Sequence, residues 1–196
     1  MRCSPAQCDE AAWRDSCRRS SRGYTLLELV VATSILAVLA AIALPSLSAG
    51  ESERLDLAAG WIAETARFAR AEALRTGNPV YLEIDRDTER LRVAVADLSG
   101  STAAPGTILR DPITKQQLDV ILSDMAATAS IDVTDEPFDY PSGGRQPVVV
   151  FDAQGLPFIK SSDAFQLLES GNITLERGGQ QRIVRVSPLT GRVTIQ

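Results

Sequence analysis

The sequence has no histidine, and its cysteines are confined to the first 17 residues (Cys3, Cys8 and Cys17). Histidine is the commonest metal ligand and a frequent general base, so its absence removes most familiar hydrolase and zinc-site designs. Beyond Cys17 no thiol is available for a disulfide or for nucleophilic catalysis. These absences predict a protein that is not an enzyme, with no catalytic residue, no metal site and no cofactor.

Basic residues are the minority, since 20 Lys and Arg stand against 25 Asp and Glu, a formal charge of −5. Nonspecific binding to nucleic acid depends on clustered Lys and Arg side chains. The acidic composition therefore argues against a nucleic-acid partner. The length of 196 residues is compatible with one folded domain and an additional membrane helix.

Charge is almost absent from one long stretch near the beginning of the chain. From Tyr24 to Ala49 the only charged side chain is Glu28. About 20 apolar residues, at a rise of about 1.5 Å each, are enough to cross the hydrocarbon core of a bilayer. A carboxylate within such a helix costs about 2.5–3.5 kcal/mol at the membrane centre and less near an end. The stretch therefore predicts a membrane helix in which Glu28 requires a partner.

The motif G-Y-T-L-L-E-L-V-V-A, which begins at Gly23, resembles the class III signal of type IV pilins and type II secretion pseudopilins. The resemblance implies that a prepilin peptidase cleaves between Gly23 and Tyr24 and methylates the new amino terminus of Tyr24. The family more often has Phe at the position of Tyr24, so the aromatic character is retained. Residues 1–23 would then be a leader. The mature chain would keep 15 basic and 22 acidic residues, a charge of −7, and no cysteine.

The motif also has a physical interpretation. A free amine and a carboxylate are each unfavourable alone in lipid but can neutralise each other. In a staggered bundle of parallel helices, Glu28 of one subunit meets the amino terminus of its neighbour, and this contact sets the axial register. The alternative is an uncleaved signal-anchor helix in which Glu28 reaches the membrane interface.

A basic cluster precedes the apolar stretch, formed by Arg18, Arg19 and Arg22. By the positive-inside rule this end stays in the cytoplasm. The sequence thus predicts a single-pass inner-membrane protein whose first helix half, residues 24–49, is transmembrane and whose globular part is periplasmic.

Residues 50–77 predict a second, amphipathic helix half. Apolar residues recur there at steps of three and four: Leu55, Ala58, Ile62, Ala66, Ala69 and Ala73. Trp61 and Phe68 flank this stripe and are expected in the core or at its margin. Gly77-Asn78-Pro79 predicts the end of the helix. Pro45 predicts a bend, because an interior proline removes one backbone hydrogen bond.

Residues 78–196 predict an antiparallel β domain, so the fold class is α+β, with a long N-terminal helix packed on a β-sheet domain. Loops are expected at Ser99–Gly106 and Asp135–Gln146. Short apolar pieces of undecided type occur at Ile108–Leu109 and Val120–Leu122. The expected strands are Val80–Ile84, Leu91–Ala96, Ile131–Val133, Val148–Phe151, Leu156–Ile159, Ile173–Glu176, Gln181–Ser187 and Arg192–Gln196.

Three later segments narrow the resemblance: A-R-F-A-R-A-E-A-L-R-T-G-N-P-V (66–80), F-D-A-Q-G-L-P (151–157) and V-S-P-L-T-G-R-V (186–193). They are similar to the GspH/FimT family of minor pseudopilins. The resemblance implies a non-catalytic subunit of the periplasmic pseudopilus of a type II secretion system, which helps export folded proteins across the outer membrane. Its partners would be other pseudopilins, the prepilin peptidase and the inner-membrane platform.

Two alternatives remain open at this point. A FimT-like minor pilin would serve pilus assembly or DNA uptake, and that branch carries a Gly-Arg-any-Arg pattern. Here the corresponding residues are Gly191-Arg192-Val193-Thr194, so the second arginine is missing. The other basic side chains of this region are Arg177, Arg182 and Arg185. A membrane-tethered enzyme would need a carboxylate pair, for which Asp85 with Asp87 and Asp135 with Glu136 are the candidates.

Overall fold

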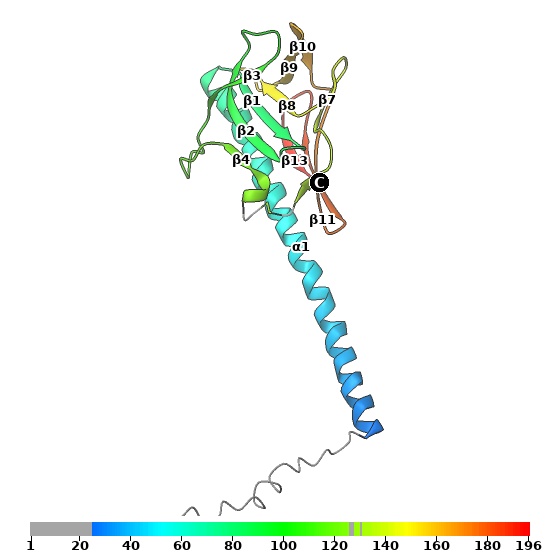
Figure 1. Cartoon of the computed structure of the whole chain (residues 1–196). Helices are drawn as coiled ribbons and strands as arrows, with labels where there is room; N and C mark the ends of the chain where they lie inside the picture. Colours follow the sequence, from blue (N-terminus) through cyan, green and yellow to red (C-terminus); the bar gives the residue numbers. More distant parts are fainter. Residues whose placement is uncertain (1–24, 126–127, 130) are drawn as a thin grey trace, which may run out of the picture. The chain divides into compact units, whose positions relative to one another are not determined.

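The computed structural model describes residues 25–125, 128–129 and 131–196, except for the side chains of residues 40–51 (Figure 1). The chain divides into two compact units, residues 1–45 and 46–196, which are described separately below. The leader with its cysteines, the proposed cleavage site at Gly23 and Tyr24, and the basic cluster lie outside the described residues.

One helix, α1, runs over Leu26–Thr76. It ends where the sequence predicts, because Gly77 adopts a left-handed φ of 71° and its N–H donates to the carbonyl of Ala73 at 2.9 Å. A residue without a Cβ takes this conformation at little cost, and Pro79 then prevents further helical bonding. The bend expected at Pro45 stays a prediction, since Pro45 lies among the residues whose side chains are not described.

Two antiparallel sheets follow the helix in the second unit. The first sheet has the order β10-β9-β8-β1-β2-β3, and β4 also pairs with β2; the second has the order β13-β12-β11-β6-β7, and β5 also pairs with β11. The strands of the first sheet are β1 (Val80–Asp85), β2 (Arg90–Asp97), β3 (Ala104–Ile108), β4 (Asp119–Ile121), β8 (Val148–Phe151), β9 (Pro157–Ser161) and β10 (Ala164–Leu167). Those of the second are β5 (Asp132–Val133), β6 (Phe138–Tyr140), β7 (Gly144–Gln146), β11 (Ser170–Arg177), β12 (Gln180–Val186) and β13 (Val193–Ile195). A short 3₁₀ turn, η1, occupies Leu122–Asp124.

The chain passes repeatedly from one sheet to the other. After β4 it enters the second sheet, returns to the first at β8 and leaves it again at β11. The returning strand β8 pairs with β1, with Leu82 opposite Val149. All four residues of β8 are buried. The predicted α+β fold with an antiparallel β domain is confirmed, and the division into two sheets is an additional finding.

Two of the expected loops are wrong in part. Ser99–Gly106 contains the first residues of β3. This strand was not predicted because it includes Pro105 and Gly106, and both residue types have low strand propensity. Gly106 is required there because a Cβ would lie 2.8 Å from the carbonyl oxygen of Val95 in β2. Asp135–Gln146 contains the hairpin of β6 and β7. In β6, Phe138 and Tyr140 are buried on either side of Asp139, the period of two typical of a strand.

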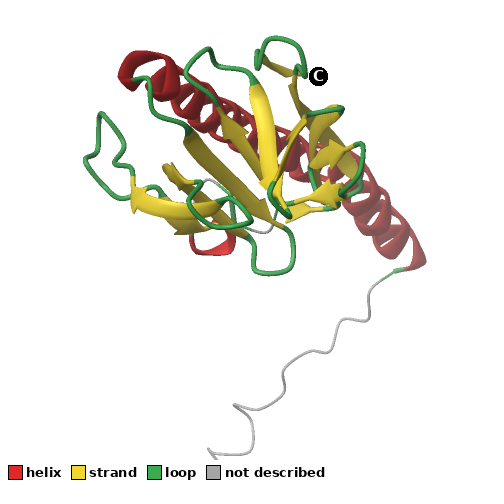
Figure 2. Cartoon of the chain, turned by 90° about the horizontal axis from the view of Figure 1, so that it is seen from above, coloured by secondary structure: helices red, strands yellow, loops and turns green. Residues whose placement is uncertain are grey.

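The predicted apolar stripe of α1 forms the helix side of one continuous core. Every member of the stripe is at most 1% exposed, and Ala59 and Ala63 join it at 0%. Trp61 and Phe68 pack at the margin of this core, as expected. Figure 2 shows the helix running along one side of the strands of both sheets. Because most of the buried helix residues are alanines, the backbone of α1 can approach the sheets closely.

Ala66→Leu tests this close approach. The added methylenes would overpack the core and lower the free energy of unfolding by about 1–3 kcal/mol or more. Ala71→Leu is the matched control, because Ala71 lies on the same helix and is exposed. Urea unfolding of the full chain in detergent, followed by Trp61 fluorescence in a Trp13→Phe background, measures both variants. Equal stabilities would contradict the close packing.

Candidate functional site

The first turn of α1 carries the acid singled out by the sequence. Thr25 precedes the helix, and its Oγ1 accepts a hydrogen bond from the N–H of Glu28 at 3.2 Å. The carbonyl of Thr25 accepts from the N–H of Leu29, also at 3.2 Å. Thr25 is therefore the N-cap, and Glu28 occupies the third helical position, the Thr-x-x-Glu spacing of a capping box. A carboxylate there is stabilised by the positive end of the helix dipole.

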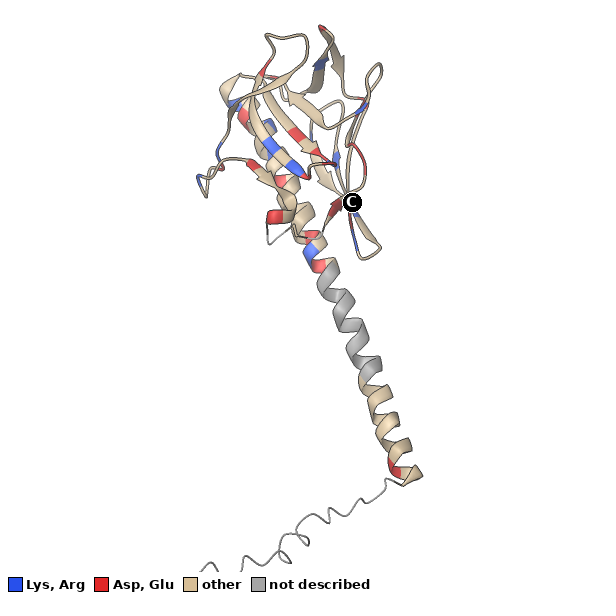
Figure 3. Ribbon diagram, in the orientation of Figure 1, with Lys and Arg blue, Asp and Glu red and all other residues tan. Residues whose placement is uncertain are grey.

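The side chains of residues 25–39 are all exposed. Nine of them are large and apolar: Leu26, Leu27, Leu29, Val30, Val31, Ile35, Leu36, Val38 and Leu39. The hydroxyl groups of this segment bond within the helix, with Thr33 donating to the carbonyl of Leu29 at 3.0 Å and Ser34 to that of Val30 at 2.7 Å. This segment offers apolar surface on all sides, and Glu28 is its one charged group (Figure 3). Among the residues that the structure describes, no helical segment is both long and apolar enough to cross a bilayer.

The three later sequence segments meet at one place in the second unit. Arg70 projects from α1, and its Nε donates to the carbonyl of Thr190 at 2.9 Å and to that of Gly155 at 3.3 Å. Gly155 belongs to the turn between β8 and β9 in the first sheet, and Thr190 to the turn between β12 and β13 in the second. One guanidinium thus connects the helix with a turn of each sheet, an arrangement named here the arginine clamp.

The two turns of the arginine clamp touch each other through glycines. Gly155 and Gly191 have φ values of 75° and 63°, in the left-handed region. A Cβ on Gly191 would overlap the carbonyl oxygen of Gly155 and press on Arg70, and a Cβ on Gly155 would lie 3.0 Å from Nε of Arg70. Both the backbone conformation and the available space therefore require glycine at these positions.

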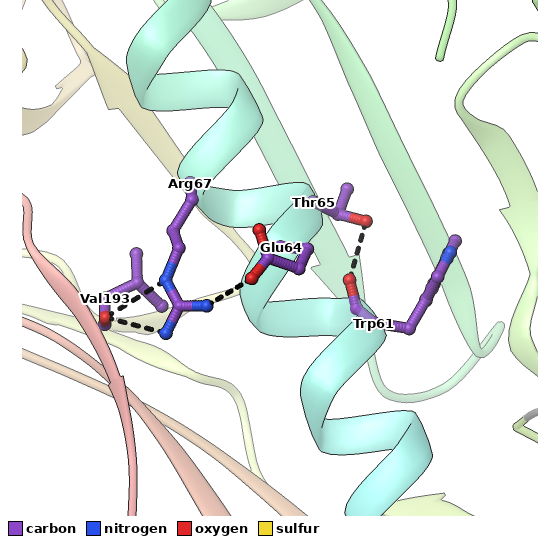
Figure 4. Close-up of polar contacts among 5 residues, drawn as sticks. All are labelled: Trp61, Glu64, Thr65, Arg67 and Val193. Carbon is purple, nitrogen blue, oxygen red and sulfur yellow. Dashed lines mark hydrogen bonds and ion pairs between the residues drawn. The ribbon is translucent and has the colours of Figure 1, made fainter. Parts of the chain in front are cut away.

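A second arginine secures the last strand, as Figure 4 shows. Arg67 donates to the carbonyl of Val193 from Nε at 3.3 Å and from Nη2 at 3.2 Å, and it pairs with Glu64 at 2.6 Å. Trp61 and Arg67 leave the helix on opposite sides, and the hydroxyl of Thr65 donates to the carbonyl of Trp61 at 2.9 Å. A surface hollow of about 510 Å³ lies here, lined by Arg67, Arg70, Arg192 and the residues of β13.

Two of the four basic side chains considered for DNA contacts have intramolecular partners, whereas Arg185 and Arg192 are exposed. Arg177 donates to the carbonyl of Ala129 at 2.6 Å, and Arg182 pairs with Asp56 at 2.5 Å. In the hollow, Arg67 and Arg70 are bound to backbone carbonyls, and Arg192 is exposed. The region is an internal anchoring site more than a phosphate-binding surface.

Of the two candidate carboxylate pairs, the charges of Asp85 and Asp87 act on Glu136, whereas Asp135 pairs with Arg145 at 2.9 Å. Burial raises the pKa of Glu136, and the neighbouring charge of Asp85 raises it further. Glu136 Oε2 is buried without a hydrogen-bond partner among the described residues. Asp85 caps its own turn by accepting from the N–H of Asp87 at 2.8 Å. No group of three or more potential metal ligands is found among the described residues.

Comparisons with known proteins place these segments in a family. Residues 18–44 match the prokaryotic N-terminal methylation motif, and residues 58–190 match the family model of the type II transport protein GspH. The chain belongs to the GspH family. It is therefore a minor pseudopilin of the type II secretion system, as the sequence predicts, and its N-terminal motif indicates membrane anchoring.

Among solved structures, the chain is similar to the minor pseudopilin EpsH from the type 2 secretion system of Vibrio cholerae. The identity is 15%, the match covers 73% of this chain and 96% of that chain, and the TM-score is 0.46. No curated protein sequence matches the chain significantly.

Sequence reasoning missed two features of the site. The capping box was readable from Thr25 and Glu28, since Thr-x-x-Glu ahead of an apolar helix is its signature. The arginine clamp was not readable, because its members lie on α1 and on turns of two different sheets. Each of the three GspH segments contains one member of the clamp, and only the folded structure shows that these members are in contact.

Replacing Gly191 tests the arginine clamp. Gly191→Ala places a Cβ against the Gly155 carbonyl and is expected to lower the free energy of unfolding by about 3 kcal/mol or more. Gly179→Ala is the matched control, because Gly179 also has a positive φ of 77° but open space around its Cα. The control should lose about 1 kcal/mol from the backbone conformation alone. Equal losses in urea unfolding of the full chain would show that the contact between the two turns is unimportant.

Glu136→Gln tests the environment of Glu136 through the pH dependence of the free energy of unfolding. A raised pKa in the folded state means that ionisation of Glu136 opposes folding, so its cost grows as the pH rises above the unfolded value of about 4.3. Relative to the native chain, Glu136→Gln should gain stability at pH 7, and the gain should vanish near pH 4.

Asp119→Asn should show the opposite pH dependence. For both variants the free energy of unfolding is measured by urea unfolding of the full chain between pH 3 and pH 7, roughly the range that spans the carboxyl pKa values. A hydrogen bond from Arg90 lowers the pKa of Asp119, which pairs with Nε of Arg90 at 2.6 Å. This variant should lose about 1 kcal/mol at pH 7, and the loss should fade as the pH drops below about 4. The same pH dependence in both variants would contradict the assigned environments.

Proposed function

We propose that this GspH-family subunit enters the pseudopilus as a non-catalytic building block and that Glu28 is its assembly residue. The single observation that carries the proposal is the position of Glu28. It lies in the capped first turn of a helix segment whose described side chains are all exposed and otherwise uncharged. Among the described residues Glu28 has no ion-pair partner, so a neighbouring subunit's amine can supply the counter-charge.

Processing supplies this amine. The prepilin peptidase cleaves between Gly23 and Tyr24 and methylates Tyr24, which exposes one new amino terminus per subunit. In a staggered helical array, that amino terminus lies beside Glu28 of an adjacent pseudopilin. A buried pair of this kind fixes the axial register because any other register leaves both charges unpaired. The match of residues 18–44 to the N-terminal methylation motif supports this step.

The subunit acts at the inner membrane. Residues 24–49 form the membrane-embedded half of the helix, the N-terminus faces the cytoplasm, and residues 78–196 form the periplasmic domain. Its partners are the major and minor pseudopilins of the filament, together with the inner-membrane platform that drives assembly. The exposed apolar surface of residues 26–39 supports this placement, because such surface is stable only in lipid or against other helices.

Secretion is favoured over DNA capture by the engagement of the basic residues. Arg67, Arg70, Arg177 and Arg182 all bind groups of the domain itself. With Arg185 and Arg192 left to meet phosphates and an overall charge of −5, binding would be weak and sensitive to salt. A non-catalytic role is supported by the absence of histidine from the chain, and the polar groups of the clamp serve packing.

The function is tested by replacing Glu28 in cells that contain the secretion system. The native chain should lose 23 residues, because processing removes residues 1–23, and should carry one added methyl group on Tyr24. Glu28→Ala and Glu28→Val should be inserted and cleaved in the same way, yet be lost from sheared pseudopili by at least about tenfold, the equivalent of about 1.4 kcal/mol.

Glu53→Ala is the control, since Glu53 is exposed on the same helix and carries the same charge. It should enter pseudopili as the native chain does. Normal incorporation of the Glu28 variants would refute the assembly role. An unshortened native chain would refute the processing step on which that role depends.

A further inference from the structure

The free edges of the two sheets are protected to different degrees. The sheets end at β10 and β3 and at β13 and β7, and the short strands β4 and β5, which lie off these paths, each carry an aspartate (Asp119 and Asp132). An unprotected edge pairs with any extended chain, so soluble proteins block edges with proline, charge, bulges or short strands. β3 contains Pro105 and has a register shift against β2, and β7 carries Arg145. In β13, the outward carbonyl of Val193 is occupied by Arg67.

β10 is short, at four residues, but it has none of the other protections. Its sequence, Ala-Phe-Gln-Leu, contains no charge and no proline, and its pairing with β9 is regular throughout. Ser162 and Asp163 form the two-residue turn, with φ values of 51° and 63°, which fits a type I′ hairpin. In such a hairpin Ala164 and Gln166 bond to β9, so the N–H and C=O groups of Phe165 and Leu167 point to the open edge.

The same two residues present apolar side chains. Phe165 is 65% exposed and Leu167 is 66% exposed. Their cross-strand partners are Lys160 and Phe158, so these four side chains share one face of the hairpin. The rings of Phe158 and Phe165 lie 5.7 Å apart, and a hollow of about 240 Å³ is lined by Phe158, Phe165, Leu167, Gln166 and Asp152. Figure 1 shows β9 and β10 together at the end of their sheet.

Acidic residues surround this apolar edge. Asp163 and Glu169 lie at the two ends of β10, both exposed, and Asp152 lines the hollow. The ammonium of Lys160 donates to the carbonyls of Gly100 at 2.7 Å and Leu98 at 2.9 Å, and it lies 3.8 Å from the carboxylate of Asp163, so it offsets only part of this negative charge. A second copy of this acidic chain would therefore be repelled, whereas a strand with basic residues at its ends would be attracted.

We propose that β10 is a docking edge to which another pseudopilus subunit adds an extended strand. The added strand carries apolar side chains at alternate positions, which fill the hollow beside Phe165 and Leu167. Basic residues flank it at the spacing of Asp163 and Glu169. Its backbone completes the hydrogen bonds that Phe165 and Leu167 leave open, the mode known as β-augmentation. That the partner is a pseudopilus subunit rests on the proposed function; the docking edge itself does not.

The test uses the full chain expressed with the other pseudopilins of its secretion system. A photo-crosslinking amino acid is placed at Phe165 or Leu167, and at Ile113 or Leu189 as controls, which are exposed apolar positions outside the strands. The positions in β10 should cross-link to another pseudopilin at an apolar segment flanked by Lys or Arg, at least tenfold more than the controls. Cross-links to a second copy of this chain, or equal yields at all four positions, would overturn the proposal.

Backbone pairing is tested separately by comparing two variants of one residue. Leu167→Ala removes the side chain, and Leu167→Pro also removes the outward N–H without breaking a bond to β9. With the cross-linker at Phe165, the proline variant should give at least a threefold lower yield than the alanine variant. Equal yields would exclude strand addition.

Unchanged unfolding in urea shows that both Leu167 variants are folded. If folding is impaired, Phe165→Glu with the cross-linker at Leu167 replaces the comparison, and an unchanged cross-link there would equally overturn the proposal. The proposed function has its own readout in the same cells, namely removal of the leader and dependence of incorporation on Glu28. A chain that is processed and incorporated but does not cross-link through β10 refutes the docking edge alone.

Discussion

The close contact between α1 and the two sheets is the constraint on which the second unit depends. Six buried alanines allow the helix backbone to approach the strands: Ala58, Ala59, Ala63, Ala66, Ala69 and Ala73. Such small side chains contribute little burial each, so large residues on the strands, such as Phe151, Phe138 and Leu175, supply most of the buried apolar surface. Arg70 then holds a turn of each sheet against the helix. The sheets also meet directly, since the hydroxyl of Tyr140 in β6 donates to the carbonyl of Val148 in β8 at 2.9 Å.

The same contact explains why the GspH segments are spread along the chain. An arginine on the helix, a glycine in one turn and a Thr-Gly pair in another are unremarkable separately. Together they close one junction, in which Gly191 makes room for the backbone carbonyl of Gly155, Gly155 makes room for the side chain of Arg70, and the guanidinium binds one carbonyl from each turn. The carbonyl of Gly155 is partly buried, and leaving such a group without a partner costs free energy, so the bond from Arg70 satisfies a requirement of the fold. This part of the family signature thus reflects packing, whereas the role proposed for Glu28 is in assembly.

Sequence reasoning succeeded where the determining interactions are local. The stripe of α1, its end at Gly77 and the hairpin of β1 and β2 follow from periodicity and turn chemistry over a few residues. It failed where a partner distant in sequence decides the structure. β3 is a strand because β2 lies beside it, despite Pro105 and Gly106. β8 is buried on both faces because it returns to pair with β1 after an excursion through the second sheet. Nothing within Val148–Phe151 indicates which strand it will join.

The functional residues divide in the same way. Glu28 was found from the sequence because a lone carboxylate in an apolar helix is anomalous wherever the helix is placed. The exposure of Phe165 and Leu167 could not be predicted from the sequence, because two apolar residues in a short strand usually indicate a buried face. Only the order of strands reveals that β10 has no outer neighbour, and only then does its lack of charge become unusual. The other edge strands carry proline, a charged side chain or an occupied carbonyl. An edge left open in such a domain is best explained by a partner that covers it.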